Sequence, residues 1–214
     1  MADGEAAAPR PLEKICRLVY CFGVGTKGAA TRERLVDGAR ELIETHGYSG
    51  TGLNQVLAVS GAPRGSLYFH FPGGKDELVA AALEKAAEET AALLRELSQQ
   101  RADLADYARS LVGAFAARME ESRFTKGCPL ATVALDVAAT NDRVHAVCRK
   151  GYRSWQAVVA ERLLAEGWEP ARAEADAWSV LSLVEGALLL ARATRSREPL
   201  DRAGEAVVRL LERP

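Results

Sequence analysis

The sequence predicts an all-α protein of about nine helices. From Ala30 onward, apolar residues recur at intervals of three and four, which is the spacing of one face of a helix. No segment has the pattern of a strand together with a second strand that could pair with it. The 214 residues are 48% hydrophobic and 27% charged, which is typical of a folded globular chain and excludes wholesale disorder or a collagenous sequence.

The first predicted helix ends at Gly47. Leu35, Ala39, Leu42 and Ile43 follow the i, i+4, i+7, i+8 spacing of a single buried face. Glycine is the residue that most often closes a helix, because it adopts the left-handed conformation without a steric cost.

A second, shorter helix is predicted to begin at Thr51, whose hydroxyl can cap its N-terminus. Leu53, Val56 and Leu57 form its buried face, and the helix stops at Gly61.

The third predicted helix is also short. Pro63 suits its first turn, where a missing N–H costs nothing. Leu67 and Phe71, four residues apart, are expected to point inward, and the sequence FPGG at 71–74 ends the helix.

Longer helices are predicted after Lys75, because no glycine or proline interrupts the chain until Gly113. The helix that carries Trp178 to Ala193 is apolar around most of its circumference, which indicates contacts on several sides. The boundaries that we expect for the others are a break in the polar segment 98–103, starts at Leu104, Pro129 and Pro170, a separation at 140–142, an end at Gly167 and a final helix after Pro199.

Negative charge is absent from one part of the chain. The first 75 residues have a net charge of +2 and the remainder −3, and Thr45 to Lys75 contains no aspartate or glutamate in 31 residues. This window includes the second and third predicted helices, so a surface that disfavours negative charge is expected there. Chance, or a glycine-rich connector, would give the same pattern.

Two short helices joined by a tight turn containing glycine have the form of a helix-turn-helix, whose second helix lies in the DNA major groove. Arg64, near the start of that helix, can pair with guanine O6 and N7, and Gly65 lets the backbone approach. Hydroxyl, imidazole and ammonium groups nearby can donate to phosphates. The DNA-binding candidates are Thr51, Pro63, Arg64, Gly65, Ser66, Tyr68, Phe69, His70 and Lys75.

The segment LIETHGYSGTGLNQVLAVSGAPRGSLYFHFPGGKDEL resembles the DNA-binding domain of TetR-family transcriptional regulators. The family pattern G-x-x-x-G-[ST]-L-Y-x-[HY]-F is matched by GAPRGSLYFHF at 61–71. The extra glycine in FPGGK departs from the common spacing and sets Lys75 one residue later than in most members. The sequence KGCPLATVALDVA is similar to the LmrA/YxaF-like branch of the family.

The resemblance implies three parts: a flexible N-terminal arm at 1–29, a helix-turn-helix DNA-binding domain at 30–75, and a ligand-binding and dimerisation domain at 76–214. It also implies a homodimer formed through the last two helices, which binds a palindromic operator in double-stranded DNA. A repressor that is released when a small, largely apolar molecule binds the C-terminal domain is the function expected. Two heads about 34 to 36 Å apart would each meet one half-site.

The ligand-binding candidates are aromatic and sulfur-bearing side chains expected to face between the middle helices. Such residues at helical spacing also occur in ordinary cores, so that alternative stays open. Glu185, within an apolar helix, needs a partner, a pocket or an interface. The candidates are Tyr107, Phe115, Met119, Cys128, Tyr152, Trp155, Trp178, Leu181 and Glu185.

Other functional classes have weaker support. GVGTKG at 23–28 matches the GxGxxG pattern of dinucleotide sites, but no second strand and no acidic residue at a strand end follow it. The four cysteines and three histidines lack metal-ligand or catalytic spacing, so we expect no metal, cofactor or catalytic residue. A cytoplasmic protein without a membrane segment is expected. The alternative is an all-helical enzyme or carrier in which the helix-turn-helix is structural.

Overall fold

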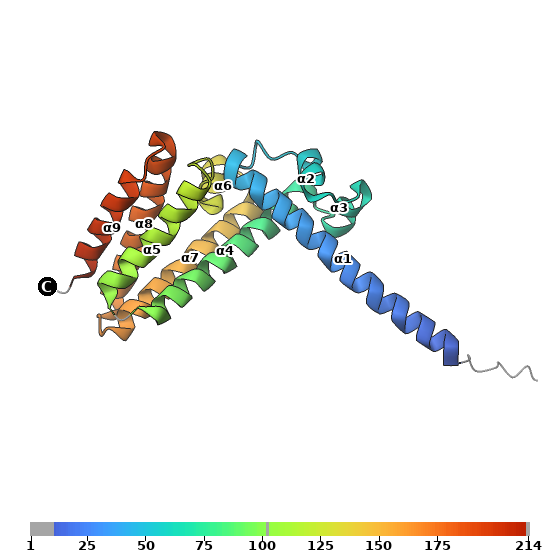
Figure 1. Ribbon diagram of the computed structural model, residues 1–214, viewed down its shortest axis with the longest axis horizontal. Helices are drawn as coiled ribbons and strands as arrows, with labels where there is room; N and C mark the ends of the chain where they lie inside the picture. Colours follow the sequence, from blue (N-terminus) through green and yellow to red (C-terminus); the bar gives the residue numbers. More distant parts are fainter. Residues whose placement is uncertain (1–10, 102, 213–214) are drawn as a thin grey trace, which may run out of the picture.

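The computed structural model describes residues 11–101 and 103–212, with side chains described from Gly28 onward. Within these residues the chain forms nine helices and no strand, which confirms the predicted fold class (Figure 1). The helices are α1 (Pro11–His46), α2 (Leu53–Ser60), α3 (Arg64–His70), α4 (Gly74–Gln100), α5 (Leu104–Glu121), α6 (Pro129–Val137), α7 (Asp142–Ala165), α8 (Pro170–Thr194) and α9 (Glu198–Leu211).

The C-terminal half of α1 packs with α2 and α3 into a small unit that we call the head. Leu35, Ala39 and Ile43 of α1 are buried, and Leu67 and Phe71 hold α3 against them. All five side chains were predicted to face inward. The head therefore has its own apolar centre, which fixes the two short helices to the longer one.

Thr51 does not cap α2. Gly52 is the N-cap residue, and its N–H donates to the side-chain oxygen of Gln55 at 3.0 Å. Thr51 is buried, and its hydroxyl donates to the carbonyl of Gly47 at 2.6 Å. Because this bond satisfies the hydroxyl inside the turn, the predicted roles of Thr51 in capping and in DNA contact have no support from its position.

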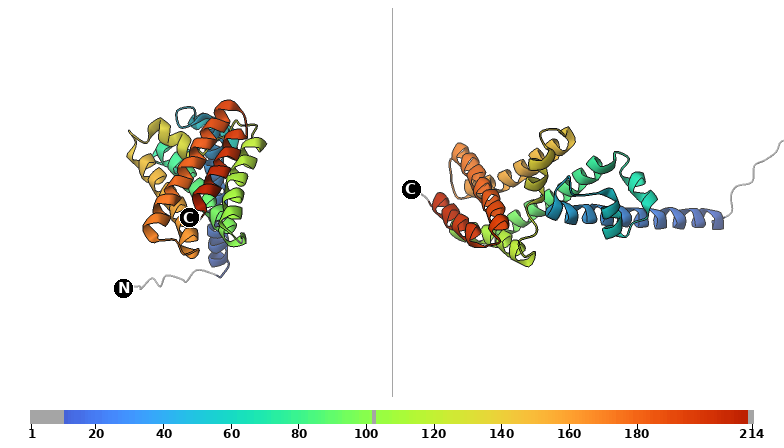
Figure 2. Two further views of the ribbon diagram at one scale, coloured as in Figure 1. Left: turned by 90° about the vertical axis from the view of Figure 1, so that its left-hand side faces the viewer. Right: turned by 90° about the horizontal axis from the view of Figure 1, so that it is seen from above.

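Helices α4 to α9 form a larger bundle that we call the body, in which α9 lies on the side away from the head and the C-terminal end of α8 reaches the end of α1 (Figure 2). The centre of the body is the packing of α4 against α7. The indole N–H of Trp155 on α7 donates to the carbonyl of Ala87 on α4 at 2.9 Å. Gly151, one turn earlier on α7, allows Leu130 of α6 to pack closely between these helices.

Helix α1 begins at Pro11, well before Ala30, and its N-terminal part extends past α2 and α3 (Figure 1). Residues 11–29 of the arm expected at 1–29 are thus helical, residues 1–10 lie outside the described chain, and the flexibility of the arm stays a prediction. The three glycines at 23, 25 and 28, which gave the GxGxxG pattern, each lower the propensity of this segment to form a helix. The same glycines lie inside a continuous helix, so the strand and turn of a dinucleotide site are not formed.

Gly151 provides a test of this packing. A Cβ atom there would lie 2.5 Å from Leu130 Cδ2 and 3.1 Å from the Cβ of Ala87, whereas at Gly113, within α5, no atom lies within 4 Å. We expect Gly151→Ala to lower the free energy of unfolding by about 1 to 3 kcal/mol through overpacking. Gly113→Ala should raise it by up to about 1 kcal/mol through helix propensity. Urea unfolding measures both, and equal effects of the two substitutions would contradict the close contact.

Candidate nucleic-acid interface and ligand cavity

Helix α3 presents one buried and one exposed face. Tyr68 and Phe69 are 63% and 80% exposed, unusually high values for aromatic side chains on a helix whose Leu67 is fully buried. The rings of Phe69 and His70 meet edge to face, with 4.9 Å between their centroids. Arg64 and Gly65 are also exposed at the start of the helix. The exposed face is therefore polar, aromatic and free of carboxylates, as a surface for phosphates and base edges requires.

Two predicted phosphate donors already have partners in the head. The hydroxyl of Ser66 donates to the carbonyl of Pro63 at 2.6 Å. The ammonium group of Lys75 lies 4.3 Å from the ring centroid of Tyr48, a cation–π contact. Burial lowers the pKa of Lys75, while Asp136 and Asp76 act in the opposite direction. Lys75 is therefore a partly buried cation at the edge of the exposed face.

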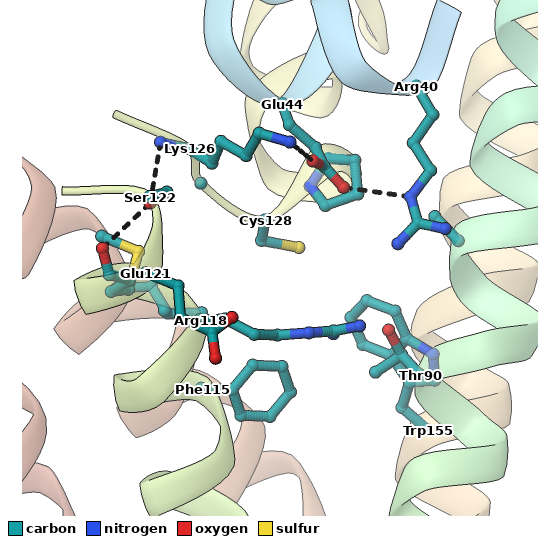
Figure 3. Close-up of a pocket in the computed structure, with 15 residues that line it drawn as sticks. Arg40, Glu44, Thr90, Phe115, Arg118, Glu121, Ser122, Lys126, Cys128 and Trp155 are labelled. Atoms are coloured by element: carbon teal, nitrogen blue, oxygen red, sulfur yellow. Dashed lines mark hydrogen bonds and ion pairs between the residues drawn. The ribbon is translucent and has the colours of Figure 1, made fainter. Parts of the chain in front are cut away.

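A cavity of about 360 Å³ lies where the head meets the body (Figure 3). Its walls come from α1, α4, α5, α7, α8 and the loop before α6. Apolar side chains form much of the surface, and ionic side chains gather on the side towards α1 and the loop. The lining residues are Arg40, Glu44, Ala86, Thr90, Phe115, Arg118, Met119, Glu121, Ser122, Lys126, Gly127, Cys128, Pro129, Trp155 and Leu188.

A chain of ion pairs forms the ionic wall. Arg40 Nε donates to Glu44 Oε1 at 3.0 Å within α1, and the same guanidinium pairs with Glu89 of α4. The other oxygen of Glu44 lies 3.2 Å from the ammonium group of Lys126. Burial opposes the charge on Arg40, but its bonds to Glu44 and Glu89 outweigh this and raise its pKa. The chain thus joins α1 to α4 and to the loop before α6 along the edge of the cavity.

Backbone groups strengthen the same junction. Arg192, at the end of α8, donates to the carbonyl of Thr45 at 2.6 Å. The N–H of Gly127 donates to the carbonyl of Glu44 at 3.0 Å, and the N–H of Ser49 donates to Asp136 of α6 at 2.8 Å. The end of α1 is consequently tied to three separate parts of the body.

Four of the predicted ligand-binding side chains line the cavity: Phe115, Met119, Cys128 and Trp155. The other five do not line it. Tyr107 and Leu181 are buried elsewhere in the body, and Trp178 is exposed on α8. Tyr152 and Glu185 do not line the cavity but interact with Cys128, which does.

Glu185, Cys128 and Tyr152 form a partly buried polar cluster, of which Cys128 lines the cavity. Burial raises the pKa of the Glu185 carboxyl, and the neighbouring thiol and phenol only partly oppose this effect. Burial and the adjacent carboxylate raise the pKa of the Cys128 thiol and, likewise, that of the Tyr152 phenol. One carboxyl oxygen of Glu185 has no hydrogen-bond partner among the described residues. The cluster favours neutral, protonated side chains.

Sequence reasoning missed the ionic half of the cavity. Arg40 and Glu44 were placed in the head, where their charged side chains gave no sign of facing the body. Arg118 and Lys126 are charged residues at the end of a helix and in a loop, positions that normally face solvent. Only the packing of α1 across α4, α5 and the loop brings these groups together.

Helix α8 carries a large apolar surface on the outside of the body. Leu189 and Leu190 are 58% and 56% exposed, and Trp178 and Leu183 are also exposed. The same helix also exposes the small residues Ala175, Ser179, Ser182, Gly186 and Ala193. By length and composition α8 could also cross a membrane, but eight of its residues are buried inside the body. Apolar surfaces of this kind on one helix indicate an interface.

Glu185 leads to a prediction about pH. Below the unfolded-state pKa of about 4.3, the carboxyl is protonated in both states and its burial costs little. As pH rises, the unfolded chain loses this proton first, because burial raises the pKa in the folded protein. Folded wild-type protein therefore loses stability above that pH. The stability of Glu185→Gln relative to wild type should increase between pH 4 and pH 7 in urea unfolding. A pH-independent difference would contradict the burial of this group.

Comparisons with known proteins agree with this geometry. Residues 35–82 match the family model "Bacterial regulatory proteins, tetR family", and residues 105–206 match "Transcriptional regulator LmrA/YxaF-like, C-terminal domain". The HTH-type transcriptional regulator LmrA of Bacillus subtilis is 29% identical over 86% of this chain and 97% of its own. An uncharacterised HTH-type transcriptional regulator of Mycobacterium tuberculosis is 37% identical over 79% of this chain and 88% of its own.

The solved structures give the same fold. A TetR-family transcriptional regulator from Agrobacterium tumefaciens superposes with a TM-score of 0.74 at 22% identity, covering 85% of this chain and 97% of that one. Sequence identity along most of the chain, the matched head and the matched body all lead to one conclusion. The chain belongs to the TetR family of HTH-type transcriptional regulators, with a C-terminal domain of the LmrA/YxaF-like kind.

Proposed function

We propose that this regulator is a dimeric repressor that leaves a palindromic operator when a small molecule enters the cavity between head and body. The observation that carries the proposal is that Arg40 and Glu44 line the cavity from α1, the helix on which the DNA-binding head is built. A ligand in the cavity thus contacts the head's own scaffold. One relative, DhaR of a Mycobacterium species, is named a transcriptional repressor. Such a protein would act in the cytoplasm.

The apolar face of α8 supports the proposed homodimer. A single recognition helix contacts few base pairs, so two heads are needed for useful specificity. Leu189, Leu190 and Trp178 would be covered by the same helix of a second copy around a two-fold axis, together with α9. Helix α9 and most of α8 lie away from α2 and α3 (Figure 2), so an interface there would leave both α3 helices accessible.

Linkage provides the release mechanism. A ligand that prefers the conformation with weak DNA affinity lowers operator affinity by the ratio of its affinities for the two conformations. The tie between α1 and the body, through Glu44, Lys126 and Gly127, is where such a preference would be set. Because Leu67 and Phe71 are fully buried, α3 would move with α1 rather than independently. Each head would then move as a unit, and the distance between the two heads would change.

Arg64 tests DNA recognition. We expect Arg64→Ala to weaken binding to an operator selected from random duplexes by about 1 to 3 kcal/mol, and to relax preference at one base pair. Lys75→Ala should weaken binding on all sequences by a similar factor, since it would contact only phosphate. Arg109→Ala, an exposed arginine of α5 in the body, is the control and should have no effect. Gel-shift titrations at several salt concentrations measure all three. No salt-sensitive, sequence-selective binding by wild-type protein would contradict the proposal.

Leu190 tests the dimer. Leu190→Glu places a carboxylate in the proposed interface, and we expect it to weaken association by about 2 kcal/mol or more. Leu135→Glu is the matched control, because Leu135 is an exposed leucine, at 79%, on α6. Light scattering after gel filtration should give a dimer for wild type and Leu135→Glu and a monomer for Leu190→Glu at low micromolar concentration. An unchanged dimer with Leu190→Glu would place the interface elsewhere.

A further inference from the structure

We infer that the effector of this cavity is an anion: an aromatic or otherwise apolar body carrying one carboxylate or sulfonate group, bound by the guanidinium of Arg118. The inference rests on the proposed ligand-responsive function and specifies the chemistry of its ligand. It adds a charged group to the small, largely apolar molecule that the sequence suggested.

The residues that line the cavity carry one more positive charge than negative charges. Its lining includes three cations, Arg40, Arg118 and Lys126, and two carboxylates, Glu44 and Glu121. Glu44 pairs with both Arg40 and Lys126, and Arg40 pairs in addition with Glu89 just outside the lining. The ionic wall towards α1 is therefore internally satisfied, and a ligand would have to break an existing pair to bind there.

Arg118 is different from the other two cations. Its side chain has no ion pair or hydrogen bond with any residue that the structure describes. Figure 3 shows it extending from α5 into the cavity, between Phe115 and the ionic wall. Glu121, three residues later on the same helix, is exposed and forms no ion pair with it. Arg118 is itself an exposed residue, and a guanidinium with free donors at the wall of a cavity can bind a carboxylate or sulfonate.

The apolar half of the cavity faces this guanidinium. Phe115, Met119, Trp155 and Leu188 provide an apolar surface that suits a flat aromatic body. When such a body excludes water, the attraction between Arg118 and an anionic group increases, because the local dielectric constant falls. A cationic ligand would be repelled by the free guanidinium, and the one lining carboxylate without an ion pair among the described residues, that of Glu121, belongs to an exposed residue. Shape and charge together favour an aromatic anion.

Two fluorescent probes separate charge from shape. 1-Anilinonaphthalene-8-sulfonate and N-phenyl-1-naphthylamine share one aromatic skeleton, and only the first carries a sulfonate. We expect Arg118→Met, which keeps an extended apolar side chain, to lower the affinity for the sulfonate probe by about tenfold or more. Its effect on the neutral probe should be less than about twofold. Arg109→Met, on the exposed side of the same helix, is the control and should change neither affinity.

The outcomes are distinct. An equal loss of affinity for both probes in Arg118→Met would mean that Arg118 only shapes the cavity. An unchanged affinity for the sulfonate probe would mean that the anion does not bind at Arg118. Either result overturns the inference. Circular dichroism and operator binding verify that the variants are folded.

Operator release distinguishes this inference from the proposed function. If the sulfonate probe binds through Arg118 but leaves operator affinity unchanged, the anion site stands and the ligand response fails. If the neutral probe releases the operator and the sulfonate probe does not bind, the ligand response stands and the anionic class is wrong.

Discussion

The attachment of the end of α1 to the body is the constraint on which the rest of this protein depends. One face of α1 carries Leu35, Ala39 and Ile43 into the head, while Arg40 and Glu44 reach the body from another face. The Arg40 and Glu44 side chains are only 21% and 14% exposed, so salt screens the pair between them less than it screens surface pairs, whereas their partners Glu89 and Lys126 are more exposed. A single helix therefore belongs to both units, and under the proposed function a change at the cavity would be transmitted to the head.

The recognition helix depends on this arrangement, because α3 has only seven residues and a helix that short is not stable alone in water. Burial of Leu67 and Phe71 against α1 supplies its stability and leaves Arg64, Tyr68 and Phe69 exposed. Because Leu67 and Phe71 are four residues apart, they lie on one side of α3, and Tyr68 and Phe69 are left on the exposed side. The exposed aromatic rings would be a liability on a free surface, and they are explained by a nucleic-acid partner.

Most of the fold could be predicted from the sequence, because the helical periodicity identifies the helices and glycines and prolines mark their boundaries. Two of the helices, for example, begin at Pro129 and Pro170. The start of α1 could not be predicted, because glycines at 23, 25 and 28 oppose a helix locally. In the head, Arg64 and Phe69 were placed correctly on the exposed face, whereas Thr51 is buried by a hydrogen bond within the turn. Of the residues that line the cavity, the sequence identified only aromatic and sulfur-bearing ones. The charged residues come together only because α1 packs across the body, and the spacing of charged residues in the sequence does not predict that packing.

The coupling between cavity and head is the central claim, and linkage allows it to be measured from the ligand side. The affinity of 1-anilinonaphthalene-8-sulfonate would be determined for free protein and for protein saturated with its selected operator. We expect DNA to weaken probe binding by about 5- to 150-fold, the usual range of allosteric coupling. The factor should be smaller in Glu44→Gln, in which the pair between α1 and Lys126 is lost. Equal probe affinity with and without operator would contradict the account.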